Sequence, residues 1–142
     1  MDITLVIPTY NEAGNIPILV GKVFEIFGDN NLNGHVIVVD DDSPDKTWKL
    51  AEDLRAQYPE LRVLRRQDKR GLSSAVLDGI AMTNTDIIGV IDADLSHPPE
   101  KIPELVTPIM NGEADFTLGS RYINQGGIAN WPLRRKIFSK IA

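Results

Sequence analysis

The chain has 142 residues, of which 42% are hydrophobic and 25% are charged, proportions that are ordinary for one globular domain with a hydrophobic core. It contains no cysteine, which excludes disulfide bonds and zinc–thiolate sites, and no apolar run approaches the ~20 residues of a membrane-spanning helix. The net charge of −5 argues against a groove for nucleic-acid phosphates, so we expect no nucleic-acid partner.

The predicted elements alternate between strands and helices. Residues 3–7 are rich in β-branched side chains and predict a strand that ends at Pro8, and residues 16–27 repeat apolar side chains at helical spacing. A short apolar run at 36–39 predicts a second buried strand. Ser43 then has the chemistry of an N-cap and is followed directly by proline, so we expect the second helix to open here.

The same alternation continues through the second half of the chain. Strands are predicted at 61–64 and 87–91, and helices at 72–83 and 102–110, the last of them bent where Pro108 removes a helical hydrogen bond. Strands separated by helices at such intervals form right-handed crossover units. The expected fold is therefore α/β, a three-layer, mainly parallel sheet with helices on both faces.

The last part of the chain is predicted to hold a strand at 116–118, a glycine-bearing loop and the start of an amphipathic helix at 133–142. Four basic residues and no acidic residue lie within residues 131–142. Positive charge beside apolar positions is typical of a helix at an anionic membrane surface, although a solvated helix end or packing on further sequence are alternatives. We expect residues 1–142 to form a single domain that is truncated at its C-terminal end.

Polar clusters follow four of the predicted strands, at the edge of a parallel sheet where ligands bind. The sharpest is Asp92-Ala93-Asp94, directly after an apolar strand. Two carboxylates on alternate positions of an extended segment point the same way, and they repel each other unless a cation lies between them. Hard oxygen ligands favour Mg²⁺ or Mn²⁺, with diphosphate oxygens completing the shell. A polar turn in which Asp94 caps the next helix is the alternative.

Three aspartates follow the second predicted strand, at 40–42. One of them is expected to serve a turn together with Ser43, and a carboxylate here is also suited to accept hydrogen bonds from a base or a ribose. His97 is expected in a loop ahead of two prolines rather than as a metal ligand. The basic run at 65–70 is interpreted as a solvated loop with room for a phosphate contact, and Trp48 as a packing residue.

Other chemistries lack their motifs. Neither G-x-G-x-x-G nor G-x-x-x-x-G-K-[ST] nor G-x-S-x-G occurs, and the lack of cysteine leaves few candidates for a nucleophile–base pair. A nucleotidyltransferase also uses paired aspartates and a metal, but a glycine-rich basic loop is typical after its first strand, where this chain has Thr9-Tyr10-Asn11-Glu12. A non-catalytic nucleotide-binding module is the second alternative.

Several motifs in order resemble those of family 2 glycosyltransferases with the GT-A fold: V-I-P-T-Y-N-E, V-V-D-D-D-S-P-D, R-G-L-S-S-A, D-A-D-L-S-H-P-P-E and G-S-R-Y. Within that family the chain is most similar to polyprenyl-phosphate sugar synthases of the dolichol-phosphate mannosyltransferase type. The resemblance spans nearly the whole chain. It implies an inverting transferase that moves mannose from GDP-mannose, or glucose from UDP-glucose as the runner-up, to a polyprenyl or dolichyl phosphate. The implied location is cytoplasmic, peripheral to the cytoplasmic face of a membrane.

The resemblance also implies roles for individual residues. Asp94 and Arg121 would be catalytic, and Asp92, Asp94 and Ser96 would hold Mg²⁺ or Mn²⁺. Ser96 departs from the family pattern, because many relatives carry glutamine there. The nucleophile would be a lipid phosphate oxygen, which is anionic near neutral pH and needs cations rather than a general base. The residues implied to bind the nucleotide sugar are Pro8, Tyr10, Glu12, Val39, Asp41, Asp92, Ala93, Asp94, Ser96 and Arg121.

Overall fold

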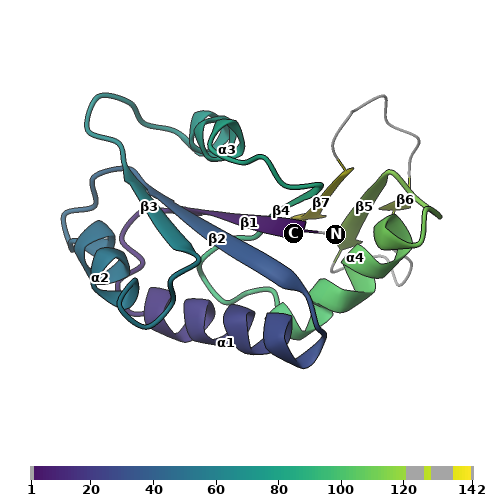
Figure 1. Ribbon diagram of the computed structural model, residues 1–142. Coiled ribbons are helices and arrows are strands. Elements are labelled where there is room, and N and C mark those ends of the chain that lie inside the picture. Colours follow the sequence, from purple (N-terminus) through teal and green to yellow (C-terminus); the bar gives the residue numbers. More distant parts are fainter. Residues whose placement is uncertain (1, 121–126, 129–135, 142) are drawn as a thin grey trace.

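The computed structural model describes residues 2–120, 127–128 and 136–141, with the backbone alone from residue 116 onward. Its strands form one sheet in the order β3-β2-β1-β4-β7-β5-β6 (Figure 1). Neighbouring strands pair in parallel except β5 and β6, which are antiparallel. The strands are β1 (Asp2–Thr9), β2 (Asn33–Asp40), β3 (Leu61–Arg65), β4 (Ile87–Val90), β5 (Phe116–Ser120), β6 (Gly127–Ile128) and β7 (Lys136–Ile141).

Helices cover both faces of this sheet. Figure 1 shows α1, α2 and α4 on one face and α3 on the other. The predicted three-layer, mainly parallel α/β fold is therefore confirmed. Within the described ranges, no helix is long and apolar enough to cross a membrane. The helices are α1 (Ile16–Asp29), α2 (Thr47–Leu54), α3 (Leu72–Ala81), α4 (Ile102–Met110) and the short 3₁₀ helix η1 (Pro99–Lys101).

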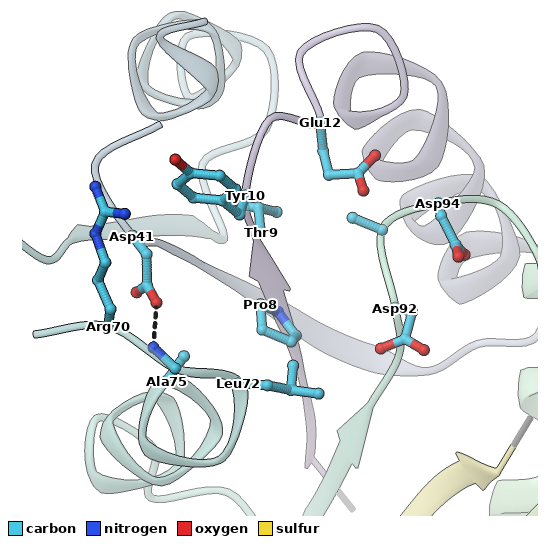
Figure 2. Close-up of a pocket in the computed structure, with 12 residues that line it drawn as sticks. Pro8, Thr9, Tyr10, Glu12, Asp41, Arg70, Leu72, Ala75, Asp92 and Asp94 are labelled. Atoms are coloured by element: carbon cyan, nitrogen blue, oxygen red, sulfur yellow. Dashed lines mark hydrogen bonds between the residues drawn. The ribbon is translucent and has the colours of Figure 1, made fainter. Parts of the chain in front are cut away.

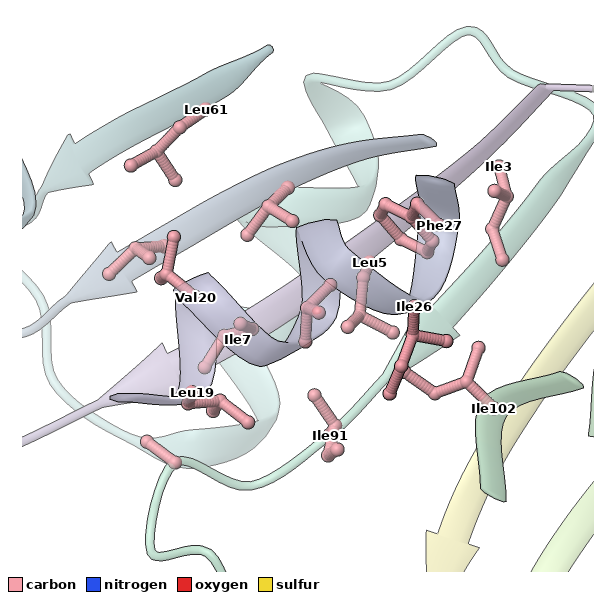
Figure 3. Packing of buried hydrophobic residues seen from close by; sticks show 14 of the residues in the cluster. Ile3, Leu5, Ile7, Leu19, Val20, Ile26, Phe27, Leu61, Ile91 and Ile102 are labelled. Carbon is pink, nitrogen blue, oxygen red and sulfur yellow. The ribbon is translucent and has the colours of Figure 1, made fainter. Parts of the chain in front are cut away.

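The central strand β1 is buried on both faces. Its alternate residues Ile3, Leu5 and Ile7 belong to the larger core cluster, which they share with the inner side of α1 (Figure 3). Val6 belongs instead to a smaller cluster that also contains Ala75 of α3. A parallel strand covered by helices on both sides is a nearly continuous apolar run, which is why this strand is recognisable from the sequence.

The second helix begins later than predicted, at Thr47 rather than at Ser43. Asp45 Oδ1 accepts a hydrogen bond from the Thr47 N–H at 3.0 Å, and Lys46 has a left-handed backbone with φ of 59°. Helical geometry therefore starts only after Lys46. The prediction of Ser43 as the helix cap was wrong, because its hydroxyl donates to Asp40 Oδ1 at 2.6 Å and so serves the turn after β2.

The predicted amphipathic helix at 133–142 was also wrong, because Lys136–Ile141 form strand β7. This strand pairs with β4 on one side, where Ile137 lies opposite Ile88, and with β5 on the other. Pairing along both edges satisfies the backbone groups of the segment, and isoleucine and phenylalanine favour strands. Tertiary pairing thus overrides the helical spacing. Residues 133–135 and residue 142 lie outside the described part of the chain.

The close packing of α3 on the sheet depends on Gly79. A Cβ atom at this position would lie 2.5 Å from Val6 Cγ1 and 3.0 Å from Val39 Cγ2. We expect Gly79→Ala to lower the free energy of unfolding by about 1–2 kcal/mol, because the cost of overpacking exceeds the gain in helix propensity. Urea denaturation followed by circular dichroism measures this change.

Gly28 in α1 is the matched control, because a Cβ atom there meets nothing within 4 Å. We expect Gly28→Ala to raise the free energy of unfolding by about 0.5 kcal/mol through helix propensity alone. An equal gain from Gly79→Ala would contradict the close packing of α3.

Candidate functional site

A cavity of about 430 Å³ opens where β1, β2 and β4 end, at the carboxyl-terminal edge of the sheet (Figure 2). The parallel pairing of β1 with both neighbours brings these three strand ends together, although they are far apart in the sequence. The first turn of α3 supplies a further wall. The lining residues are Pro8, Thr9, Tyr10, Glu12, Asp41, Arg70, Gly71, Leu72, Ala75, Asp92, Ala93 and Asp94.

The loop after β1 is held in place by the turn after β2. The Asn11 N–H donates to Ser43 Oγ at 2.8 Å. The fully buried Asp40 carboxylate accepts hydrogen bonds from the hydroxyls of Thr9 and Ser43, each at 2.6 Å. Asp40 is therefore the aspartate that serves the turn with Ser43, as predicted. Because Thr9 and Asn11 are held by these bonds, Tyr10 between them is held at the rim of the cavity.

Asp41 lines the cavity with a carboxylate that already has partners. Arg66 binds it in a bidentate way, from Nε to Oδ1 at 2.7 Å and from Nη2 to Oδ2 at 3.0 Å. The Gly71 N–H donates to Oδ2 at 2.9 Å, the bond dashed in Figure 2. A carboxylate has about four acceptor positions, so one remains for a ligand.

The charge state of Asp41 follows from these contacts. Burial raises the pKa of its carboxyl group, but the hydrogen bonds from Arg66 and Gly71, with the positive charges of Arg66 and Arg70, outweigh that effect. The net pKa therefore lies below the ordinary value. Asp41 is thus an ionised group that can only accept hydrogen bonds from a ligand.

The other side of the cavity is acidic. Figure 2 shows Asp92 and Asp94 on the segment after β4, on the same side of the cavity as Glu12. Asp92 is half-buried, and Asp94 is exposed with its Oδ1 accepting the Ser96 N–H at 2.9 Å. The described residues contain no group of three or more histidines and carboxylates that could hold a metal ion by themselves. The pair fits an ion such as Mg²⁺, which proteins bind through one or two carboxylates together with substrate phosphates and water.

Tyr10 and Arg70 border the half of the cavity that contains Asp41. Tyr10 is 44% exposed, and the Arg70 guanidinium carbon lies 5.4 Å from the centroid of its ring. Figure 2 shows Asp41 and Arg70 on one side of Pro8. The carboxylates of Glu12, Asp92 and Asp94 lie on the other side. An exposed aromatic ring beside an acceptor suits a base or sugar, whereas the acidic half suits a cation with its bound anion. The cavity therefore has two chemically different halves.

The structure brings most of the predicted binding residues together, and leaves a few apart. Val39 is fully buried in the cluster beneath α3, so its side chain is not part of the lining. Ser96 is half-buried beside the cavity, and buried His97 lies in the loop ahead of η1, as predicted. Arg121 lies outside the described residues. The predicted residues that do line the cavity are Pro8, Tyr10, Glu12, Asp41, Asp92, Ala93 and Asp94.

Part of the lining was missed by the sequence interpretation, and most of it lies within residues 71–75, where the chain enters α3. The segment R-G-L-S-S-A, at residues 70–75, is the signal in the sequence that could have identified them. Gly71 has a φ of 124°, a region that favours glycine, and this lets the chain turn into α3 with its N–H directed at Asp41. The missed lining residues are Thr9, Gly71, Leu72 and Ala75, whereas Arg70 belongs to the run 65–70, for which a phosphate contact was expected to be possible.

The interpretation of 65–70 as a solvated loop was wrong for its first residues. Arg66 is only 4% exposed, because it pairs with Asp41. Arg65 is the last residue of β3, and its guanidinium carbon lies 3.7 Å from the centroid of the Trp48 ring. Trp48 is half-buried, so it packs as predicted, but against a cation.

The lowered pKa of Asp41 predicts a pH dependence of stability. A carboxylate whose folded pKa lies below its unfolded value of 3.8 stabilises the fold fully above that pH, and the contribution is lost as pH falls through the folded pKa. We expect Asp41→Asn to lower the free energy of unfolding by about 2 kcal/mol near neutral pH, with the difference from wild type shrinking below about pH 4. Urea denaturation from about pH 3 to 7 measures it. A difference that stays constant with pH would contradict the buried ion pair.

The family described as glycosyl transferase family 2 matches residues 4–141. The dolichol-phosphate mannosyltransferase of Pyrococcus furiosus is 46% identical over 140 residues, which are 99% of this chain and 39% of that protein. The polyprenol monophosphomannose synthase of Mycolicibacterium smegmatis is 39% identical over 142 residues, 97% of this chain and 52% of that protein. This chain therefore spans about half or less of the length of these relatives.

A solved structure agrees with the fold. Glucosyl-3-phosphoglycerate synthase from Mycobacterium tuberculosis, in complex with Mn²⁺, UDP-glucose and phosphoglyceric acid, superposes with a TM-score of 0.66 at 29% identity. The match covers 87% of this chain and 44% of that one. Because the family match extends over nearly every residue of the sheet and its helices, this chain belongs to glycosyl transferase family 2.

Proposed function

We propose that this chain is the donor-binding part of an inverting glycosyltransferase, which moves mannose from GDP-mannose to a polyprenyl phosphate. The observation that carries the proposal is the cavity that Asp41 lines on one side and that Asp92 and Asp94 line on the other. The names of the two mannosyl relatives support the sugar and the lipid acceptor. The nucleotide sugar and Mn²⁺ bound in the mycobacterial structure support a metal-dependent donor site.

The two halves of the cavity suggest a division of labour. Pro8 and Tyr10 offer apolar surface to the nucleoside, and Asp41 offers the acceptor that remains on its carboxylate. Asp92 and Asp94 would hold a divalent ion, Mg²⁺ or Mn²⁺, which would neutralise negative charge on the donor diphosphate. In this proposal Glu12 and Ala93 line the same donor cavity. Ser96 would hold the divalent ion together with Asp92 and Asp94, and its N–H, which donates to Asp94 Oδ1 at 2.9 Å, would orient Asp94.

The proposed reaction breaks the bond between the anomeric carbon and the diphosphate oxygen as a phosphate oxygen of the acceptor attacks from the opposite face. The electron pair of the broken bond leaves with the nucleoside diphosphate, and the configuration inverts. A phosphate monoester is anionic near neutral pH, so the site needs no carboxylate base for the nucleophile. The site needs cations to hold the donor diphosphate and the acceptor phosphate together. Arg121, which lies outside the described residues, is proposed to contact one of these phosphates.

A lipid-linked acceptor sets the proposed location. A polyprenyl phosphate is anchored in a membrane, so the reaction would take place at a membrane surface, with the protein peripheral to the cytoplasmic face. The predicted helix that supported this location is replaced by strand β7. The proposal of a membrane-associated enzyme therefore rests on the acceptor chemistry alone.

UDP-glucose is the second candidate donor, because the mycobacterial relative binds it on the same fold. A calorimetric panel of GDP, UDP, GDP-mannose and UDP-glucose, with and without Mn²⁺, ranks the donors. Turnover of the best donor with a polyprenyl phosphate separates a transferase from a binding module. Release of pyrophosphate from GTP or UTP in the presence of a sugar phosphate would indicate a nucleotidyltransferase instead.

The metal half of the proposal is tested with Asp94→Asn. We expect Mn²⁺ to tighten GDP binding to the wild-type chain by about tenfold or more, which is about 1.4 kcal/mol, and to have no such effect on the variant. Isothermal calorimetry with and without Mn²⁺ gives both affinities. Asp53→Asn removes the same charge from an exposed position on α2 and serves as the control. Metal enhancement that survives in Asp94→Asn contradicts the assignment.

The nucleoside half is tested with Asp41→Asn in the absence of metal. Asparagine is preferred to alanine, because alanine would remove both acceptors that Asp41 offers to the buried Arg66, whereas asparagine keeps one of them. We expect GMP affinity to fall by about tenfold, since a hydrogen bond to an ionised group contributes about 1.5–3 kcal/mol. A loss that appears only when Mn²⁺ is present would show that Asp41 acts on the metal half instead.

A further inference from the structure

Arg66 is a buried cation with a complete set of acceptors. A guanidinium group has five N–H donors. Its Nε donates to Asp41 Oδ1 at 2.7 Å, its Nη2 donates to Asp41 Oδ2 and to the Gly71 carbonyl, and its Nη1 donates to Ser74 Oγ and Asp78 Oδ2, each of these four at 3.0 Å. Every donor is therefore used, and the side chain is held in one orientation.

These acceptors belong to two segments of the chain that are far apart in the sequence. Asp41 directly follows β2, whereas Gly71, Ser74 and Asp78 lie in the segment that enters and forms α3. Asp41 and Gly71 themselves line the cavity. Arg66 is not among the lining residues, so it lies behind this wall and joins its parts.

Ala75 packs the wall on the sheet, whereas the Gly71 end of the wall is held by hydrogen bonds to Asp41 and Arg66. Gly71 has a φ of 124°, a conformation in which glycine is favoured and the unconstrained chain has many alternatives. Its N–H is bonded to Asp41 and its carbonyl to Arg66, so the same ion pair holds the loop at both backbone groups. A wall that is ordered before the ligand arrives spares the free energy of ordering it on binding.

We propose that Arg66 is a positioning residue: it sets the cavity wall formed by Asp41, Gly71 and the first turn of α3, and thereby aims the remaining acceptor of Asp41 at the nucleoside. The second half of this statement rests on the proposed function. Lysine cannot take over the role, because an ammonium group is a point charge with three donors and cannot bind a carboxylate through a planar fork.

A role in positioning differs from a role in stability alone. If Arg66 only stabilised the fold, its replacement would lower the melting temperature and leave the ligand affinity of the folded protein unchanged. If it acts through Asp41, replacement weakens nucleotide binding only while Asp41 is present. Val23→Ala is the control for stability, because Val23 is fully buried in the core cluster of α1 and away from the cavity.

The first measurement is independent of any nucleotide. Amide hydrogen exchange by NMR compares the wild-type chain with Arg66→Lys. We expect the Gly71 amide to exchange about tenfold faster or more in the variant, while amides of β1 keep their protection. Unchanged protection of Gly71 would overturn the proposal.

The second measurement is GDP affinity without metal, for Arg66→Lys, Asp41→Asn and the double variant. We expect Arg66→Lys to weaken GDP binding by about tenfold in the wild-type background and by less than about twofold in the Asp41→Asn background. Val23→Ala should leave the affinity unchanged. Equal losses in both backgrounds, or an equal loss in Val23→Ala, would overturn the proposal.

Asp78→Asn tests the proposal if Arg66→Lys does not fold. Asp78 is partly exposed on α3, and its replacement leaves Arg66 and Asp41 paired. We expect about a threefold loss of GDP affinity, and again none in the Asp41→Asn background. No loss in either background contradicts the proposal. If the wild-type chain binds neither GDP nor UDP, the proposed function fails, and Gly71 exchange still decides whether Arg66 sets the wall.

Discussion

The pairing of β1 along both edges is the constraint on which the rest of the molecule depends. β1 pairs in parallel with β2 over its whole length, and with β4 from Ile3 to Val6. Burial of Ile3, Leu5 and Ile7 against α1 stabilises this arrangement by about 2 kcal/mol for each side chain. Because the three strands run in the same direction, they end at the same edge, and the polar segments that follow them must meet there. The cavity is thus a consequence of how the core strand is paired.

The ion pair of Arg66 with Asp41 connects the core to that cavity. Buried ion pairs contribute little net stability compared with apolar residues of the same shape, whereas removal of one partner is costly because the other charge stays buried. The pair is therefore better understood by what it holds in place. It joins the end of β2 to the loop before α3 and to α3 itself, the one helix on its face of the sheet in the described residues.

The charges of the cavity follow a simple physical division. Asp41 has its negative charge compensated by Arg66, so it can face a neutral nucleoside without a counter-ion. Asp92 and Asp94 lie at the same strand end and face the cavity beside Glu12, so that half favours a cation. A nucleoside diphosphate with a bound divalent ion has the same two parts. Its nucleoside is neutral and matches the Asp41 half, and its diphosphate holds the cation that matches the acidic half. This match supports donor binding as the function of this family 2 domain.

The strands β1 to β5, their parallel arrangement and the polar clusters after four of them could be predicted from the sequence, because buried strands are apolar runs and ligand-binding loops carry polar residues. The sequence also singled out Asp92, Asp94 and Asp41 as candidates. It did not reveal that residues 136–141 form a strand, because pairing with β4 and β5 depends on partners far away in the chain. Nor did it separate Arg66 from the other basic residues in 65–70. The burial of Arg66 became evident only in the folded chain, because a buried charge depends on acceptors that two distant segments, at residue 41 and at residues 71–78, bring to it.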